Sequence, residues 1–367
     1  MNDEAYMQRA LTLAKKGKGK VNPNPLVGAV IVKNGKVIGE GFHEEYGGLH
    51  AERNALKSCT ESPEGSTMYV TLEPCCHYGK TPPCTEAIIK NKIKKVVVGC
   101  LDPNEKVAGK GIQLLQDAGI EVEVGILEKS CKKLNKIFFH YIQTKTPYVL
   151  MKYGMTLDGK IATTQGLSKW ITNEQSRANV HQTRNEYQAI MVGVGTVLAD
   201  NPELTCRLKD GRNPIRIICD SYLRTPLESK VVETAKSIRT ILATTIEADE
   251  ATQPYSNQGI EIMVVPRKNN RVDLCELMKL LGEKGIDSIL LEGGGNLNFS
   301  ALESEIVQEI HTYIAPKVFG GERAKSPIMG NGFNTVMNKV KLKKAKILNF
   351  DEDILIESEV SYVYRDC

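Results

Sequence analysis

The sequence has no long apolar run and no recognisable export signal. No stretch approaches the roughly 18 consecutive apolar residues of a membrane-spanning helix. Residues 1–16, MNDEAYMQRALTLAKK, lack the basic segment followed by an apolar run that marks a signal peptide. We therefore expect a cytoplasmic protein without a membrane partner, in which the ten cysteines stay reduced.

Charge of one sign and aromatic side chains are also scarce. The 48 basic and 44 acidic residues are spread along the chain and leave a net charge of +4, and aromatic residues make up 6%. Proteins that bind nucleic acid concentrate Lys and Arg on one face and use aromatic rings to stack on bases. The composition therefore argues against a nucleic-acid partner, whereas a mild basic excess is compatible with a small anionic substrate.

The length of 367 residues exceeds that of one ordinary domain and suits two. Gln-Thr-Lys-Thr-Pro at residues 143–147 is typical of a linker, and the alternation of strands and helices restarts after it. We therefore predict two α/β domains, residues 1–145 and residues 146–367. The sequence shows no internal repeat and no low-complexity segment.

The first half alternates apolar strands with amphipathic helices. VGAVIV and KVIGEG flank Lys33-Asn34-Gly35, which predicts a β-hairpin because Asn and Gly tolerate positive φ. Such alternation is typical of a sheet covered by helices on both faces. Further strands are predicted at 68–73, 95–100 and 121–126, and helices at 3–16, 51–57, 84–92 and 111–118.

The second half shows the same alternation. Two final runs, KVKLKKAKILNF and DILIESEVSYVY, predict an antiparallel pair whose lysines lie on a solvated strand edge. The earlier strands are predicted at 148–153, 189–194, 214–220, 240–245, 260–265, 288–293 and 309–316, and helices near 173–187 and 273–284.

One imidazole and two thiols in the first half have the pattern of a zinc site. His50 opens one helix, Cys75 follows a strand, and Cys84 opens the next helix, where the helix dipole favours a thiolate. Three protein ligands leave the fourth zinc position open to water, whose pKa zinc lowers to roughly 7. Glu52, in the same first turn as His50, is predicted to shuttle protons without binding the metal.

The pattern matches the H-x-E…P-C-x-x-C signature of zinc-dependent base deaminases except at the second cysteine. Eight residues, CHYGKTPP, separate Cys75 from Cys84 where the signature has two. A structural zinc therefore remains an alternative, although such a site needs four protein ligands and no carboxylate. Cys76 is expected to serve packing, and His77, His43 and Asn24 are either loop residues or substrate contacts.

Two glycine-bearing turns follow strands of the second half. They are Gly193-Val194-Gly195-Thr196 and Glu292-Gly293-Gly294-Gly295-Asn296, and the second opens a helix. Glycine lets the backbone approach a phosphate, and a helix N-terminus supplies free N–H donors. Tight packing explains a triple glycine equally well, but two such turns on one α/β sheet favour a nucleotide.

The motifs of the first half together resemble a known family. N-P-N-P-L-V-G-A-V, G-x-x-H-A-E and T-L-E-P-C-C-H-Y-G-K-T-P-P-C look like the cytidine-deaminase-like domain of the bifunctional riboflavin-biosynthesis deaminase/reductases, including the long loop between the cysteines. The resemblance implies hydrolysis of the 2-amino group of 2,5-diamino-6-ribosylamino-4(3H)-pyrimidinone 5′-phosphate. It also implies a substrate pocket lined by Asn24, His43, His77 and Lys80.

The second half resembles the reductase domain of the same family. M-K-Y-G-M-T-L-D-G-K-I-A, S-K-W-I-T, G-T-V-L-A-D-N-P-x-L-T-x-R and L-E-G-G-G carry the likeness. It implies a dihydrofolate-reductase-like fold, hydride transfer from NADPH to C1′ of the ribose, a ribityl product, and a dimer or tetramer. The implied cofactor contacts are Gly154, Trp170, Thr196, Asp200, Ser221 and the 294–300 turn with Gly294, Gly295 and Asn296. The implied substrate contacts are Ser168, Arg184, Leu204, Arg207 and Glu292.

Some roles in the second half stay open at this stage. Arg184 and Arg207 have the side chains to clamp a phosphate with two parallel donors. Lys152, Asp200 and Glu292 are equal candidates for assisting the reduction. The preference for NADPH over NADH rests on the resemblance alone, with Ser221 and Arg224 as candidates for the 2′-phosphate pocket.

Two other functions compete with a bifunctional enzyme. A nucleic-acid base deaminase with an accessory nucleotide-binding domain predicts tight, salt-sensitive binding to tRNA or single-stranded DNA in a gel shift. A nucleotide sensor with a structural zinc predicts that Glu52 is dispensable.

Overall fold

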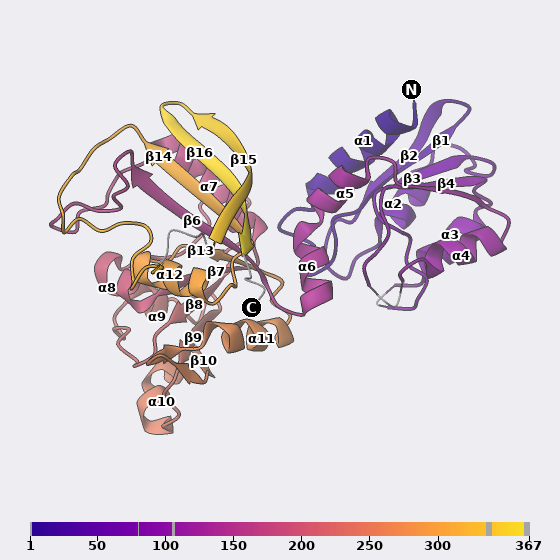
Figure 1. The fold of residues 1–367 in the computed structure, drawn as a ribbon. Coiled ribbons are helices and arrows are strands. Elements are labelled where there is room, and N and C mark those ends of the chain that lie inside the picture. Colours follow the sequence, from indigo (N-terminus) through magenta and orange to yellow (C-terminus); the bar gives the residue numbers. More distant parts are fainter. Residues whose placement is uncertain (1, 80, 105–106, 335–339, 363–367) are drawn as a thin grey trace. The chain divides into compact units, whose positions relative to one another are not determined.

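The computed structural model describes residues 2–79, 81–104, 107–334 and 340–362, and its internal contacts divide the chain into two compact units, residues 1–145 and 146–367 (Figure 1). In the described part of the chain, no helix combines the length and apolar character needed to cross a bilayer.

A sheet with the order β2-β1-β3-β4-β5 forms the centre of the first unit, counted over its described residues. β1 (Gly28–Lys33) and β2 (Lys36–Phe42) form the predicted hairpin, with φ values of 49° at Asn34 and 76° at Gly35. β3 (Thr67–Val70), β4 (Lys95–Val98) and β5 (Glu121–Val124) run parallel to one another. Their carboxyl ends therefore meet at one edge of the sheet.

The predicted helices of the first unit are confirmed as α1 (Asp3–Ala14), α2 (Ala51–Lys57), α3 (Cys84–Lys90) and α4 (Lys110–Asp117). Two more, α5 (Glu128–Leu134) and α6 (Lys136–Thr144), follow β5 where the sequence analysis predicted nothing. The buried Asn135 between them donates to the carbonyl of Leu26 and accepts from its N–H. This amide ties the α5–α6 junction to the chain just before β1.

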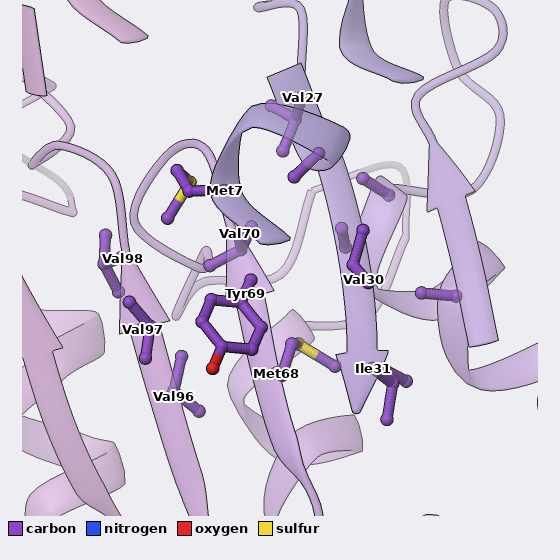
Figure 2. Close-up of a cluster of buried hydrophobic side chains, with 14 of the residues drawn as sticks. Met7, Val27, Val30, Ile31, Met68, Tyr69, Val70, Val96, Val97 and Val98 are labelled. Carbon is purple, nitrogen blue, oxygen red and sulfur yellow. The ribbon is translucent and has the colours of Figure 1, made fainter. Parts of the chain in front are cut away.

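The core of the first unit lies on both faces of its sheet. Val30 and Ile31, on opposite faces of β1, are both fully buried, as expected for a strand covered on both sides. Figure 2 shows Met7 of α1 packed near the side chains of β1, β3 and β4. Burial of one such side chain stabilises the fold by about 1.5–3 kcal/mol.

The second unit contains a larger sheet with the order β10-β9-β8-β7-β13-β6-β14-β16-β15, counted over its described residues. The strands from β10 to β14 in this order are parallel, whereas β15 and β16 pair antiparallel as predicted. The bounds are β6 (Tyr148–Thr156), β7 (Ala189–Gly193), β8 (Ile215–Cys219), β9 (Thr240–Thr244), β10 (Glu261–Val264), β13 (Ser288–Leu291), β14 (Glu309–Ala315), β15 (Val340–Phe350) and β16 (Asp353–Tyr362).

The helices of the second unit include the predicted α7 (Glu174–Glu186) and α11 (Leu274–Glu283). The helix expected after the triple glycine is α12 (Gly295–Glu303). Short elements escaped the sequence analysis because they span few turns or residues: α8 (Val194–Asp200), α9 (Lys230–Glu233), α10 (Asp249–Asn257), β11 (Arg267–Lys268) and β12 (Arg271–Val272).

The sheet topology of the second unit places both glycine turns at one edge. β7 and β13 are parallel neighbours, so the turns after them meet at their carboxyl ends. Loops at the carboxyl ends of parallel strands are the usual ligand-binding region of an α/β sheet.

Candidate active sites

Two helix starts and one loop bring the predicted zinc ligands together in the first unit. His50 is the N-cap residue of α2, Cys84 is the first residue of α3, and Cys75 follows β3. Arg53 of α2 donates to the carbonyls of Pro82 and Pro83, which fixes the start of α3 against α2. His50 Nδ1 lies 3.4 Å from the sulfur of Cys75 and 3.4 Å from that of Cys84.

These distances fit a tetrahedral zinc ion. All three donor atoms lie within 4.8 Å of one another. With a Zn–N bond of about 2.0 Å and Zn–S bonds of about 2.3 Å, a tetrahedral site separates nitrogen from sulfur by about 3.5 Å. Within the described residues this donor group has three members, and neither Cys76 nor His77 belongs to it.

Glu52 lies in the first turn of α2 and is buried, with 3% of its surface exposed. Burial, followed by the charge of Cys75, raises the pKa of Glu52 to about 7. Hydrogen bonds with Cys84 and His50 lower the pKa of Cys75, which favours a thiolate ligand. The site therefore combines a metal-binding sulfur with a carboxyl group that can exchange a proton near neutral pH.

A cavity of about 320 Å³ opens beside these residues. Asn24, His43 and His77, the expected substrate contacts, all line it, whereas Lys80 lies outside the described residues. His43 Nδ1 donates to the carbonyl of Leu49 at 3.0 Å, which leaves Nε2 to accept from the amide of Asn24 at 3.0 Å. Because burial lowers the pKa of His43, this pair offers a neutral, oriented polar edge to a ring.

Other residues of the cavity wall escaped the sequence analysis. Asp102 and Asn104 follow β4, the parallel neighbour of β3, and line the cavity. Their position after the apolar run KVVVGC was the signal that could have found them. Further lining residues are Tyr46, Glu73, Val107, Phe138, Tyr141 and Ile142.

Glu73 of the T-L-E-P-C motif organises this wall from within. It is buried, and its two carboxylate oxygens accept from the backbone N–H groups of Asp102, Gly109, Gly111 and Ile112. A carboxylate with several backbone donors stabilises the start of α4. Glu73 therefore fixes the loop that carries Asp102.

A largely buried ion-pair cluster forms a second site, in the other unit; the side chains of Glu292, Arg184 and Lys152 are 12%, 16% and 20% exposed. Arg184 of α7 donates Nε and Nη2 to Glu292, at 2.7 and 2.9 Å, and Lys152 of β6 lies 3.7 Å from the same carboxylate. Burial opposes ionisation of Glu292, but Arg184 and Lys152 outweigh it and lower its pKa to about 2. Burial lowers the pKa of Lys152, which brings a proton donor closer to the neutral range.

This cluster changes the expected use of Arg184. Its two parallel donors bind Glu292, and Nη1 donates to the carbonyl of Thr205, so the fork is engaged within the protein. Arg207 is exposed and lies 3.6 Å from Glu203. Leu204, which lies between Glu203 and Arg207 in the sequence, is buried and has a φ of 54°.

The two glycine turns face each other, and their glycines differ in how closely other atoms pack against them. A side chain at Gly295 would come within 2.7 Å of the carbonyl of Ser326, and one at Gly293 within 2.9 Å of Asn298, so both positions require close packing. Gly294 lies opposite the hydroxyl of Thr196, and Gly195 faces open space. The turns therefore leave backbone open at the starts of α8 and α12, as a bound pyrophosphate would need.

Trp170 lies in a loop held by two cations. Trp170 is 60% exposed, and the guanidinium of Arg177 lies 4.7 Å from its ring centroid. Lys317 donates to the carbonyls of Trp170 and Ile171, and Arg177 donates to that of Thr172. Thr172 in turn lies against Gly154, where a side chain would come within 3.1 Å of it.

The remaining predicted residues of this unit lie in segments that follow β6, β7, β8 and β13. Ser168 shares the loop with Trp170, Ser221 follows β8, and Asp200 ends α8 in an exposed position. Asn296 is exposed in the first turn of α12.

Comparisons with known proteins agree with the two-unit description. Residues 1–100 match the cytidine and deoxycytidylate deaminase zinc-binding region, and residues 147–356 match the RibD C-terminal domain. The riboflavin biosynthesis protein RibD of Actinobacillus pleuropneumoniae is 56% identical over 357 residues, which cover 97% of this chain and 95% of that protein.

Solved structures are similar over nearly the whole chain. The deaminase/reductase of Thermotoga maritima, titled a diaminohydroxyphosphoribosylaminopyrimidine deaminase/5-amino-6-(5-phosphoribosylamino)uracil reductase, is 40% identical with a TM-score of 0.85, and the match covers 97% of this chain and 98% of that one. RibD of Acinetobacter baumannii is 37% identical with a TM-score of 0.88, covering 98% and 99%.

Proposed function

Because the chain belongs to the RibD family of riboflavin biosynthesis proteins, we propose that its two units carry the two reactions of that family at the two sites described above. The protein is a bifunctional enzyme with a cytidine-deaminase-like unit that uses zinc and a dihydrofolate-reductase-like unit that uses NADPH. Its residues 1–145 deaminate 2,5-diamino-6-ribosylamino-4(3H)-pyrimidinone 5′-phosphate. Its residues 146–367 then reduce the ribose to a ribityl chain, giving 5-amino-6-ribitylamino-uracil 5′-phosphate.

In the deaminase unit, His50, Cys75 and Cys84 would hold the zinc ion. Zinc, when bound, supplies Lewis-acid activation of a water molecule. Glu52 moves protons from that water to a ring nitrogen and then to the departing amino group, a task that suits a carboxyl pKa near 7. Asn24, oriented by His43, presents its amide to the polar edge of the pyrimidine.

In the reductase unit, the open backbone of the two glycine turns would hold the pyrophosphate of NADPH. The cofactor, when bound, supplies the hydride. Lys152 and Glu292 are better placed than Asp200 to assist at the ribose, because they form a largely shielded pair whereas Asp200 is exposed. Lys152 can release a proton to the sugar oxygen or nitrogen while Arg184 holds Glu292 ionised.

The observation that carries this proposal is the geometry of His50, Cys75 and Cys84, with Glu52 in the same first helical turn as His50, at a cavity of about 320 Å³. Metal analysis of purified protein, followed by an NADPH-oxidation assay with the deaminated nucleotide, tests it. We expect one zinc ion per chain and NADPH oxidation that depends on the nucleotide. Active protein without metal, or a fourth protein ligand on the zinc, would contradict the proposed mechanism.

We further propose a cytoplasmic homo-oligomer, a dimer or tetramer, that acts on small phosphorylated pyrimidines. β15 is the terminal strand of its sheet, and Leu342 and Ile347 on it are 53% and 65% exposed. Long exposed edge strands with apolar residues are common sites of subunit association. Cys75 and Cys84 must stay reduced to bind zinc, which suits the cytoplasm. Analytical ultracentrifugation that finds a fully active monomer would contradict the oligomer.

A further inference from the structure

A short loop beside the ion-pair cluster is fastened to one face of α7. Arg184, which follows His181 by one helical turn, donates Nη1 to the carbonyl of Thr205 at 3.0 Å. The imidazole Nδ1 of His181 accepts from the backbone N–H of Arg207 at 3.3 Å, and its backbone carbonyl accepts from the thiol of Cys206 at 3.5 Å. Residues three apart on a helix share a face, so one face of α7 both carries the cluster and holds the loop.

The imidazole of His181 is neutral at physiological pH, and its two nitrogens have different roles. Burial, followed by the charges of Arg184 and Arg207, lowers the pKa of His181. Because Nδ1 accepts a hydrogen bond, the single proton of the neutral ring lies on Nε2. Among the residues that the structure describes, none accepts from Nε2, so this N–H is available to a ligand.

His181 lies between the reacting end of the reductase site and its expected phosphate end. The charges of Glu292 and Lys152, which the proposed function places at the ribose, both act on its ring. Arg207, whose N–H the ring holds, is the residue that the sequence indicated for the phosphate. The reacting C1′ and the 5′-phosphate are at opposite ends of the sugar. A nucleotide that reaches both groups therefore passes the imidazole.

The guanidinium of Arg207 is available to an anion although it has an acidic neighbour. Its Nη2 lies 3.6 Å from the carboxylate of Glu203, and both side chains are exposed. Exposed ion pairs of this kind contribute little free energy, so a phosphate can displace the carboxylate. The phosphate then meets a charged donor from Arg207 and a neutral N–H donor from His181.

On the basis of the proposed reductase function, we propose that His181 binds the 5′-phosphate of the nucleotide substrate through its Nε2–H, beside Arg207. The same ring positions Arg207 by accepting its N–H at Nδ1. His181 therefore helps the reductase to select a phosphorylated substrate over the corresponding nucleoside.

Reduction of the deaminated nucleotide and of its dephosphorylated nucleoside tests the contact in the full-length protein. Loss of a donor to a charged phosphate predicts a KM for the nucleotide about tenfold higher in His181→Ala. The kcat and the KM for NADPH should stay unchanged, because the lost contact acts on substrate binding. The kcat/KM for the nucleoside should also stay unchanged, whereas a general loosening of the site would lower it together with that for the nucleotide.

Two further variants separate the nitrogens of the ring. The amide of His181→Gln can place an N–H donor near the position of Nε2, and it should recover most of the preference for the nucleotide. The amide of His181→Asn can accept from Arg207 near the position of Nδ1 but is too short to replace the Nε2 donor, so it should resemble His181→Ala.

Asn185→Ala is the matched control, because Asn185 lies one turn further along α7 and accepts from the N–H of Arg212 in the same loop. It should keep the wild-type preference for the nucleotide. A His181→Ala or His181→Asn protein with the wild-type preference would overturn the proposal while the reductase function stands. An equal loss in Asn185→Ala would also overturn it, because attachment of the loop would then be the cause. Failure of the wild type to oxidise NADPH with the nucleotide would overturn the proposed function itself.

Discussion

Each unit has a glutamate at its site that is mostly shielded from solvent, and the surroundings shift the pKa values of the two carboxyl groups in opposite directions. Burial and the neighbouring Cys75 raise the pKa of Glu52 to about 7. The side chain of Glu292 is 12% exposed, and Arg184 and Lys152 lower its pKa to about 2 although desolvation opposes this. Burial alone therefore does not determine the protonation state. The cations beside a carboxylate determine whether it exchanges a proton near neutral pH or stays ionised.

The largest effect should come from removing the proton-exchanging carboxyl group. Glu52→Gln keeps the size of the side chain but removes the acid–base group, so deamination should fall by about 10²- to 10⁴-fold. Zinc content, measured by elemental analysis, should stay the same. Reduction of the pre-deaminated nucleotide should also stay at the wild-type rate, because Glu52 belongs to the other unit. A Glu52→Gln protein that binds zinc normally and deaminates at the wild-type rate would contradict the role of Glu52 in proton transfer.

Breaking the ion-pair cluster of the other unit should lower the free energy of unfolding as well as the activity. Arg184→Ala leaves Glu292 buried with Lys152 as its remaining cation, and breaking such a buried pair costs about 3–5 kcal/mol. Urea unfolding should show this loss in the reductase unit, together with a raised KM for the nucleotide. Arg239→Ala, which breaks an exposed pair with Glu261, should cost less than about 1 kcal/mol. Equal damage to deamination in Arg184→Ala would show that the two sites are not independent.

The pH dependence of stability separates the two glutamates further. Since the pKa of Glu292 falls from about 4.3 in the unfolded chain to about 2 in the folded one, its contribution is fully present above about pH 4.3 and is lost as the pH drops toward 2. The contribution is on the order of 3 kcal/mol, at 1.36 kcal/mol per pKa unit. Unfolding between about pH 5 and 2, followed by fluorescence of Trp170, measures it. Glu292→Gln should flatten the slope in this window, and identical slopes in both proteins would refute the ion-pair explanation.

The contrast between the units also explains what the sequence could predict. Cys75 and Cys84 are nine residues apart, and Glu52 shares a helical turn with His50, so the spacing of the motif carries the chemistry of the deaminase site. Arg184 and Glu292 are 108 residues apart, and sheet topology alone brings them together. The sequence therefore named both residues as substrate contacts but missed that they bind each other.

The fold was predictable to a similar degree. Apolar runs located most strands of both sheets, because those strands carry buried side chains. β5 and β15 contain no buried residue, and their alternating sequences located them instead. The hairpin β11–β12 was missed because its strands have two residues each and carry mostly charged side chains. Asp102 was missed although it follows the apolar run KVVVGC, because only the pairing of β4 with β3 brings it to the cavity.

The smallest effect should come from the loop around the single tryptophan. Arg177→Met removes the cation over the exposed ring of Trp170 and one bond to the loop backbone, while Lys317 still holds two carbonyls. An exposed cation–π contact contributes about 0.5–1 kcal/mol, so the KM for NADPH should rise by a few-fold. Because Trp170 is the sole tryptophan, its emission reports the loop directly and should change before any cofactor is added. Arg177→Lys keeps a cation over the ring and should recover part of both signals. If Arg177→Met changes neither the emission of Trp170 nor the KM for NADPH, Lys317 alone orders the loop. The cation–π contact with Arg177 then contributes nothing to the position of the ring.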